Sequence, residues 1–162
     1  RIGEKNMRKI TTTRFGEIEE DESKIVHFAA GLPAFEDEHE FIIIPYDEES
    51  PYVFLQSAVT PDLAFLMAIP FIFFPDYEFR LEDDVLESLA LERQEDLLLY
   101  TLLTIPGKDI REMTANLLAP IVINSRTNEG CQIVLDKSGY CTKHKLFSKK
   151  AEDKEASERE AN

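Results

Sequence analysis

The sequence has little of what catalytic and metal-binding sites are usually built from. Among its 162 residues there are two cysteines, three histidines and six glycines, and there is no tryptophan. The histidines lack metal-ligand spacing, and the scattered glycines form neither a phosphate-binding loop nor a GxGxxG motif. No GxSxG nucleophile motif occurs. We therefore expect no enzymatic activity, no metal and no cofactor.

Long apolar runs are also missing. No stretch reaches the roughly 18 uncharged apolar residues of a membrane-spanning helix, and the start of the chain carries no apolar secretory core. The two cysteines, Cys131 and Cys141, flank a predicted turn at residues 137–139 and do not form a CxxC pair. Such cysteines in a chain without an export signal indicate reduced structural thiols. We expect a cytoplasmic protein that contacts no membrane.

Basic residues are scarce in one half of the chain. Residues 17–95 hold 21 acidic and three basic residues, whereas the remainder holds 11 acidic and 15 basic residues, and the net charge is −14. Nucleic-acid affinity comes largely from cations that displace counterions, so we expect no direct binding to nucleic acid. The charge leaves two alternatives: a surface for a basic protein partner, or a solvated surface that only aids solubility.

Apolar residues make up 43% of the chain, which is enough for one packed core. They occur in short β-branched or aromatic runs separated by proline, glycine and acidic residues, a pattern typical of strands. The spacing predicts a mainly β, small antiparallel β-barrel-like single domain, because closing a sheet removes exposed edges. The predicted strands are residues 9–14, 16–19, 24–28, 41–45, 52–57, 64–69, 71–74, 77–81, 97–105, 114–124 and 132–135.

One short helix is predicted after residue 81. Residues 82–84 are acidic and suit a first turn, where the helix dipole stabilises anions, and Val85, Leu86 and Leu89 share one helical face. Residues 121–123 and 132–134 are expected to pair as a hairpin, with Gly130 able to adopt a positive φ in its loop.

We expect the folded domain to span residues 7–147. Residues 1–6 precede the first methionine and are expected to be a non-native or disordered extension. Residues 148–162 are a charged C-terminal tail without apolar periodicity, for which only weak i,i+4 ion pairs are available. A frayed helix or a flexible tail is therefore expected there.

Residues 70–77 form a dense aromatic segment bracketed by prolines. In a strand, Phe71 and Phe73 would face one side while Ile72 and Phe74 face the other. Four large apolar residues in a row need cover on both faces or leave an exposed patch. Two interpretations stay open: burial on both faces, and a docking groove for an amphipathic partner helix.

Six segments of the chain, taken together, resemble the flagellar assembly factor family FliW. They span roughly residues 7–147, and the segments at 70–77 and 113–124 are the specific ones. One departure is Ala34, where the family usually has glycine; alanine would be strained there if the backbone needs a positive φ. The segments are GLPAFE (31–36), LQS (55–57), PDLAF (61–65), PFIFFPDY (70–77), TIP (104–106) and MTANLLAPIVIN (113–124).

The resemblance implies a small cytoplasmic β-barrel protein without catalysis that binds two alternative protein partners. One partner is flagellin, which a FliW protein holds as a soluble monomer before export, in the manner of a chaperone. The other is the translational regulator CsrA, a dimeric RNA-binding repressor of flagellin translation. When free, a FliW protein binds and antagonises CsrA away from its RNA-binding surface, which relieves repression of flagellin mRNA. We expect a monomer when neither partner is bound.

The partner contacts are expected in two segments, residues 71–77 and residues 114–117. A rival interpretation of the second segment is that it belongs to a barrel strand and only packs the core. Two other functions stay open: an acidic mimic that competes directly with RNA for CsrA, and an enzyme or small-ligand barrel with a polar interior pocket. The expected contact residues are Phe71, Phe73, Phe74, Asp76, Tyr77, Thr114, Ala115, Asn116 and Leu117.

Overall fold

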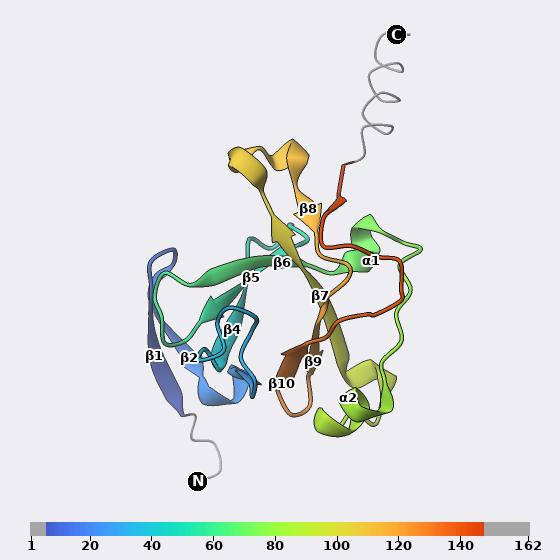
Figure 1. Ribbon diagram of the computed structural model, residues 1–162. Helices are drawn as coiled ribbons and strands as arrows, with labels where there is room; N and C mark the ends of the chain where they lie inside the picture. Colours follow the sequence, from blue (N-terminus) through green and yellow to red (C-terminus); the bar gives the residue numbers. More distant parts are fainter. Residues whose placement is uncertain (1–5, 148–162) are drawn as a thin grey trace.

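Seven strands form a closed barrel in the computed structural model, which describes residues 6–147 (Figure 1). Their order around the ring is β7-β6-β5-β4-β3-β10-β9, and β9 returns to pair with β7. All these pairings are antiparallel except that of β3 with β10. The mainly β, barrel-like fold predicted from the sequence is confirmed. The ring strands are β3 (Val26–Phe28), β4 (Glu40–Pro45), β5 (Tyr52–Ser57), β6 (Ala64–Ala68), β7 (Leu97–Thr104), β9 (Ile121–Asn124) and β10 (Glu129–Gln132).

Apolar side chains fill the interior of the barrel. Every second residue of a strand faces inward, and burying each such side chain contributes roughly 1.5–3 kcal/mol. A small-ligand barrel would need polar groups around an internal cavity, so this filled interior gives that hypothesis no support. The interior cluster consists of Val26, Phe28, Leu32, Phe41, Leu55, Met67, Ile121 and Ile123, each at most 3% exposed.

Gly130 is needed for space and not for a positive φ, so that part of the hairpin prediction is wrong. A hairpin is present, but its second strand is residues 129–132 and not the predicted 132–135, so Gly130 lies within β10 opposite Ile123 and not in the loop. A Cβ on Gly130 would lie 3.0 Å from the Phe28 ring and 3.2 Å from Val26. The left-handed residue of the loop is Asn128, with φ 57°, which is a residue type that tolerates this region.

A separate hairpin packs on the outside of the barrel. It consists of β1 (Met7–Thr12) and β2 (Gly16–Asp21), seen in blue in Figure 1. Its Ile10 packs against Ile25 and Ile42 of the barrel wall. The Arg8 guanidinium also donates to both carboxylate oxygens of Glu40, at 2.8 and 3.1 Å, and this hydrogen-bonded pair lowers the pKa of Glu40.

Several strand predictions are wrong. Residues 71–74 lie mainly in a helical turn, α1 (Pro70–Phe73), because a proline suits the first turn of a helix. Residues 77–81 belong to no strand. The predicted strand 114–124 is two strands, β8 (Thr114–Ala115) and β9, and Pro120 lies in the break between them, where it cannot donate to a ladder.

The remaining elements are short. The predicted helix is confirmed as α2 (Asp83–Ser88), and α1 is an additional one. Within residues 6–147, no helix is long and apolar enough to cross a membrane. Both cysteines are free thiols. The predicted tail and all of the predicted extension except Asn6 lie outside the described residues. The other elements are β11 (His144–Lys145) and the 3-10 turns η1 (Glu22–Lys24), η2 (Gln94–Asp96), η3 (Pro106–Lys108) and η4 (Ile110–Glu112).

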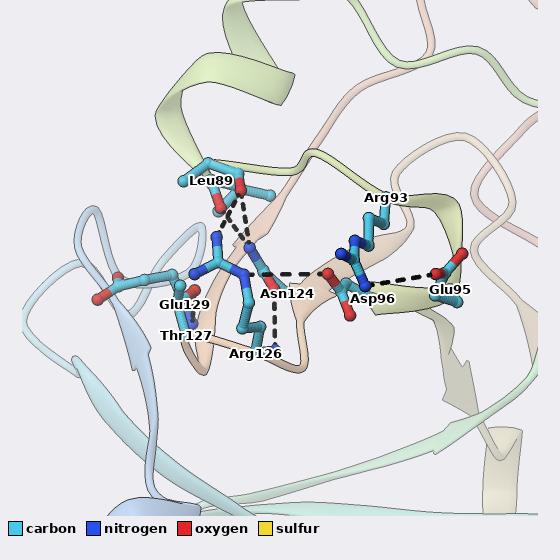
Figure 2. Close-up of polar contacts among 9 residues, drawn as sticks. Leu89, Arg93, Glu95, Asp96, Asn124, Arg126, Thr127 and Glu129 are labelled. Carbon is cyan, nitrogen blue, oxygen red and sulfur yellow. Dashed lines mark hydrogen bonds and ion pairs between the residues drawn. The ribbon is translucent and has the colours of Figure 1, made fainter.

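Asn124 fixes the end of α2 to the barrel (Figure 2). Its fully buried amide donates to the carbonyls of Leu89 at 2.7 Å and Ala90 at 3.2 Å. Its side-chain oxygen accepts from the N–H of Arg126 at 2.9 Å. Because the last carbonyls of a helix have no partner within the helix, this side chain satisfies the carbonyl of the buried residue Leu89, which would otherwise be unpaired.

We predict that Asn124→Ala lowers the free energy of unfolding by about 2–3 kcal/mol, because it leaves the carbonyl of the buried residue Leu89 without a partner. Urea denaturation measures the change. The matched control is Arg126→Ala, whose guanidinium also donates to Ala90 but lies at the surface; its cost should stay below about 1 kcal/mol. Equal effects of the two variants would contradict the buried role of Asn124.

We predict that Ala34→Gly stabilises the protein. Ala34 has φ 70°, as anticipated from the departure from the family pattern, and its side chain is exposed. Glycine removes the steric cost of this conformation, so the free energy of unfolding should rise by about 1 kcal/mol. Ala30→Gly, at an exposed position in the same loop without a positive φ, should instead lower it. A stability loss for both variants in urea titrations would contradict the assigned strain.

Candidate functional site

The aromatic segment 70–77 begins as a single helical turn. Pro70 is buried at its start, and the N–H of Phe74 closes the turn on the Pro70 carbonyl at 2.8 Å. The turn leaves Phe71 41% exposed and Ile72 54% exposed, whereas Phe73 and Phe74 are half-buried. A strand would have alternated its side chains between two faces; the turn instead presents adjacent apolar residues to solvent.

Phe73 and Phe74 line a shallow groove of about 490 Å³ beside α1. Aromatic rings dominate its wall: Tyr77 lies 4.8 Å from Tyr140, and His144 lies 5.8 Å from Tyr140 and 6.1 Å from Phe74, measured between ring centroids. We call this the aromatic groove. Its lining residues are Phe73, Phe74, Pro75, Asp76, Tyr77, Leu117, Tyr140 and His144.

Tyr77 holds the floor of the aromatic groove in place. It is only 5% exposed, and its hydroxyl donates to the Leu117 carbonyl at 2.7 Å. Burial, with a smaller contribution from Tyr140, raises the pKa of Tyr77. The hydroxyl of Tyr140 in turn accepts from the N–H of Glu78 at 2.9 Å. These bonds join three segments that are far apart in the sequence.

A second apolar hollow of about 300 Å³ adjoins α1. Its lining includes Ile69 and Phe71 together with Leu98 and Tyr100 of β7. The Phe71 ring lies 6.0 Å from Phe79, which also lines this hollow. Exposed apolar residues rimmed by polar ones are typical of protein interaction sites, so α1 and its two hollows are the candidate functional site.

Five of the nine residues expected from the sequence line the aromatic groove, and Phe71 lies in the neighbouring hollow. Thr114 and Ala115 are buried in β8, which pairs with β7 and β11. Direct contact of these two side chains with a partner would require β8 to open. Asn116 is half-buried, and its side chain accepts from the N–H of Ala119 at 3.0 Å.

Sequence reasoning missed Tyr140 and His144. They lie in a stretch without apolar periodicity, and they reach the groove only because that stretch folds back over it. The His144 Nε2 accepts from the N–H of Cys141 at 2.9 Å, which orients the ring toward Tyr140. A lone tyrosine and a lone histidine carry no sequence signal that would have identified them.

The acidic residues lie outside the aromatic groove, apart from Asp76. None of the 21 acidic residues within 17–95 is buried. They follow β2, the loops at 36–38 and 47–49, and the region around α2. The groove itself carries one exposed carboxylate, on Asp76. The residue after its lining residue His144 is the basic Lys145. The candidate site is thus mainly apolar, and most of the acidic residues lie in other segments of the chain.

Comparison with known proteins identifies the family of this chain. The family model described as FliW protein matches residues 9–146. This chain belongs to the FliW family. Flagellar assembly factor FliW of Syntrophomonas wolfei is 44% identical over 139 residues, which cover 86% of this chain and 88% of that protein. The FliW of Moorella thermoacetica is 41% identical over 148 residues, which cover 91% and 94% respectively.

The fold of a solved FliW structure agrees as well. A crystal structure of the flagellar assembly factor FliW matches this chain with a TM-score of 0.82 and 42% identity, covering 88% of this chain and 99% of that one. The resemblance inferred from the six sequence segments is therefore confirmed, and the chain is a flagellar assembly factor of the FliW family.

We predict that Tyr77→Phe lowers the free energy of unfolding by about 1–2 kcal/mol at pH 7, because the Leu117 carbonyl loses its buried partner. The raised pKa means that the folded protein keeps the Tyr77 proton while the unfolded chain loses it above about pH 10. Stability from Tyr77 is therefore present below that pH and falls above it, so the gap between wild type and Tyr77→Phe should narrow from pH 8 to pH 10.5.

Urea titrations at the two pH values measure this gap. The control is Tyr46→Phe, since Tyr46 is 60% exposed; its effect should stay within about 0.5 kcal/mol at pH 8. A Tyr77→Phe variant as stable as wild type at pH 8 would contradict the anchoring role of the hydroxyl.

Proposed function

We propose that this FliW protein binds flagellin before export as a chaperone-like partner and, when free, binds the translational regulator CsrA. Binding to CsrA would relieve repression of flagellin mRNA translation without competing for the RNA-binding surface. Both partners act before flagellin leaves the cell, so the proposal puts the protein in the cytoplasm. It requires no catalytic step, and it treats the unbound protein as a monomer.

One observation carries the flagellin part of the proposal: a chain of the FliW family holds Phe71 and Ile72 at its surface beside an aromatic groove. The terminal segments of flagellin are amphipathic and unpaired before assembly. An amphipathic helix docks through its apolar face into an apolar groove, and a segment that folds on binding can cover such a surface.

The CsrA part is supported by charge. An RNA-binding repressor presents cations to phosphates, and residues 17–95 of this chain supply 21 acidic against three basic residues. Opposite charges across an interface raise the association rate and disfavour acidic competitors. If flagellin and CsrA use overlapping surfaces, binding of either one lowers the protein's affinity for the other. The exchange of one partner for the other then needs only this reciprocal coupling.

A second candidate function is favoured by the same charge asymmetry. The acidic surface could imitate RNA and occupy the RNA-binding face of CsrA directly. The two mechanisms differ in a ternary complex. The non-competitive mechanism predicts that CsrA holds this protein in the presence of excess RNA, whereas the mimic is displaced by RNA and loses affinity steeply with salt. Gel filtration of the mixture distinguishes them.

We predict that Ile72→Asp weakens binding of flagellin or of CsrA at least tenfold, because it places a charge on the exposed apolar ridge of α1. Titration calorimetry with each purified partner measures the affinity. The melting temperature should be unchanged, since Ile72 is 54% exposed. Phe73 and Phe74 are poorer choices because both are half-buried.

The matched control is Val59→Asp, which adds the same charge at an apolar residue that is 63% exposed in the loop between β5 and β6. It should leave both affinities within about twofold. Unchanged binding of both partners by Ile72→Asp would remove α1 from the proposed interface.

A further inference from the structure

Residues 78–82 have the character of a strand but no strand beside them. Glu78, Arg80 and Glu82 are exposed while Phe79 and Leu81 are half-buried, which is the alternation of a sheet edge. Within residues 6–147, none of the backbone N–H groups of residues 79–82 donates a hydrogen bond. The sequence predicted a strand at residues 77–81, and most of that stretch alternates like a strand without forming ladder hydrogen bonds.

Residues 133–136 present a second open edge. The N–H groups of Ile133 and Leu135 donate to the carbonyls of Pro120 and Leu118, at 3.1 and 2.8 Å. The N–H of Val134 points to the opposite edge of an extended chain, and it has no partner among the described residues. Val134 is also 60% exposed.

The two segments line one groove of about 750 Å³, larger than the aromatic groove. Residues 118–120 do not line it, so the groove lies on the unpaired side of residues 133–136. Its apolar lining comes from Phe79 and Val85 on one side and Ile133 and Val134 on the other. Unpaired backbone and apolar lining together are what an added strand needs. We call this groove the strand slot.

Five charged residues line the slot: Glu78, Arg80 and Glu82 on one edge, and Asp136 and Lys137 on the other. The three along residues 78–82 alternate in sign and select the strand that fits. Glu78, Arg80 and Glu82 follow one another on the exposed face of the slot, and none of them forms an ion pair within residues 6–147. Opposite charges directly across a ladder are stabilising and like charges are destabilising. The complementary strand therefore carries a cation, an anion and a cation at alternate positions. This pattern reads the same in both directions, so it suits parallel and antiparallel pairing alike.

We propose that the strand slot binds an extended segment of a protein partner by strand addition, and that this segment alternates cation, anion and cation with apolar residues. The apolar residues would face Phe79 and Ile133 while the charges pair with Glu78, Arg80 and Glu82. The slot adjoins the helix-docking surface of α1, since Tyr140 also lines the aromatic groove and Phe79 also lines the second hollow. The proposal stands whether or not flagellin and CsrA bind at α1.

Synthetic peptides with blocked ends test the charge pattern by fluorescence anisotropy on the full chain. The peptide TVKVEVKVT should bind at least tenfold more tightly than its charge-swapped counterpart TVEVKVEVT. The triple variant E78K/R80E/E82K changes only exposed residues and should reverse this preference. As a matched control, E17K/E19K alters the exposed charges of β2 and should leave the preference unchanged.

Backbone pairing is tested separately. N-methylation at alternate residues of TVKVEVKVT removes its ladder donors and should weaken binding at least tenfold. In hydrogen–deuterium exchange, the amides of Val134 and of alternate residues within 79–82 should exchange freely in the unbound protein and at least tenfold more slowly with TVKVEVKVT present. The proposal is overturned if neither peptide binds at 1 mM, if the triple variant keeps the wild-type preference, or if the methylated peptide binds equally well.

Discussion

Closure of the barrel between β7 and β9 is the constraint on which the rest of the structure depends. Strand β7 is the longest in the ring; its first half pairs with β9, from Leu97 opposite Asn124 to Tyr100 opposite Ile121, and its second half pairs with β6 and β8. A closed ring leaves its strands without free edges and encloses an interior that apolar side chains fill. Binding surfaces must therefore lie outside the barrel, on the connecting segments and the outward faces of the strands.

The connection from β6 to β7 supplies most of that outer surface. It runs from residue 69 to residue 96 and carries α1, the strand-like segment 78–82, α2 and η2. Two buried groups fasten it to the barrel: the Tyr77 hydroxyl on the Leu117 carbonyl, and the Asn124 amide on the end of α2. Because these two bonds hold the segment between β6 and β7 against the barrel, it can keep apolar residues exposed without collapsing.

Much of the fold could be predicted from the sequence, because alternation and turn residues specify most ring strands locally. The errors fall where tertiary context decides. Pro70 starts a helical turn too short to show helical periodicity. Residues 114–124 are mostly apolar, which concealed the break before β9 even though Pro120 marks it. Residues 77–81 were predicted as a strand and do alternate in burial from residue 78, but alternation cannot reveal that the neighbouring strand is missing.

The candidate site was predictable only in part. Aromatic density singled out the residues from Phe71 to Tyr77, because dense apolar segments between prolines are conspicuous in any sequence. Tyr140 and His144 depend on how the chain folds back after β10, and burial of Thr114 and Ala115 depends on strands β7 and β11 on either side of them. Local sequence carries neither kind of information.

The central claim is that this FliW protein acts by holding proteins on the outside of a closed, filled barrel, at the connection between β6 and β7. Hydrogen–deuterium exchange of the full chain, with and without purified flagellin, tests it most directly. Slower exchange in residues 69–77 and 140–144, with β4 and β5 unchanged, is the expected result. Protection confined to the β1–β2 hairpin, or no protection at saturating flagellin, would contradict it.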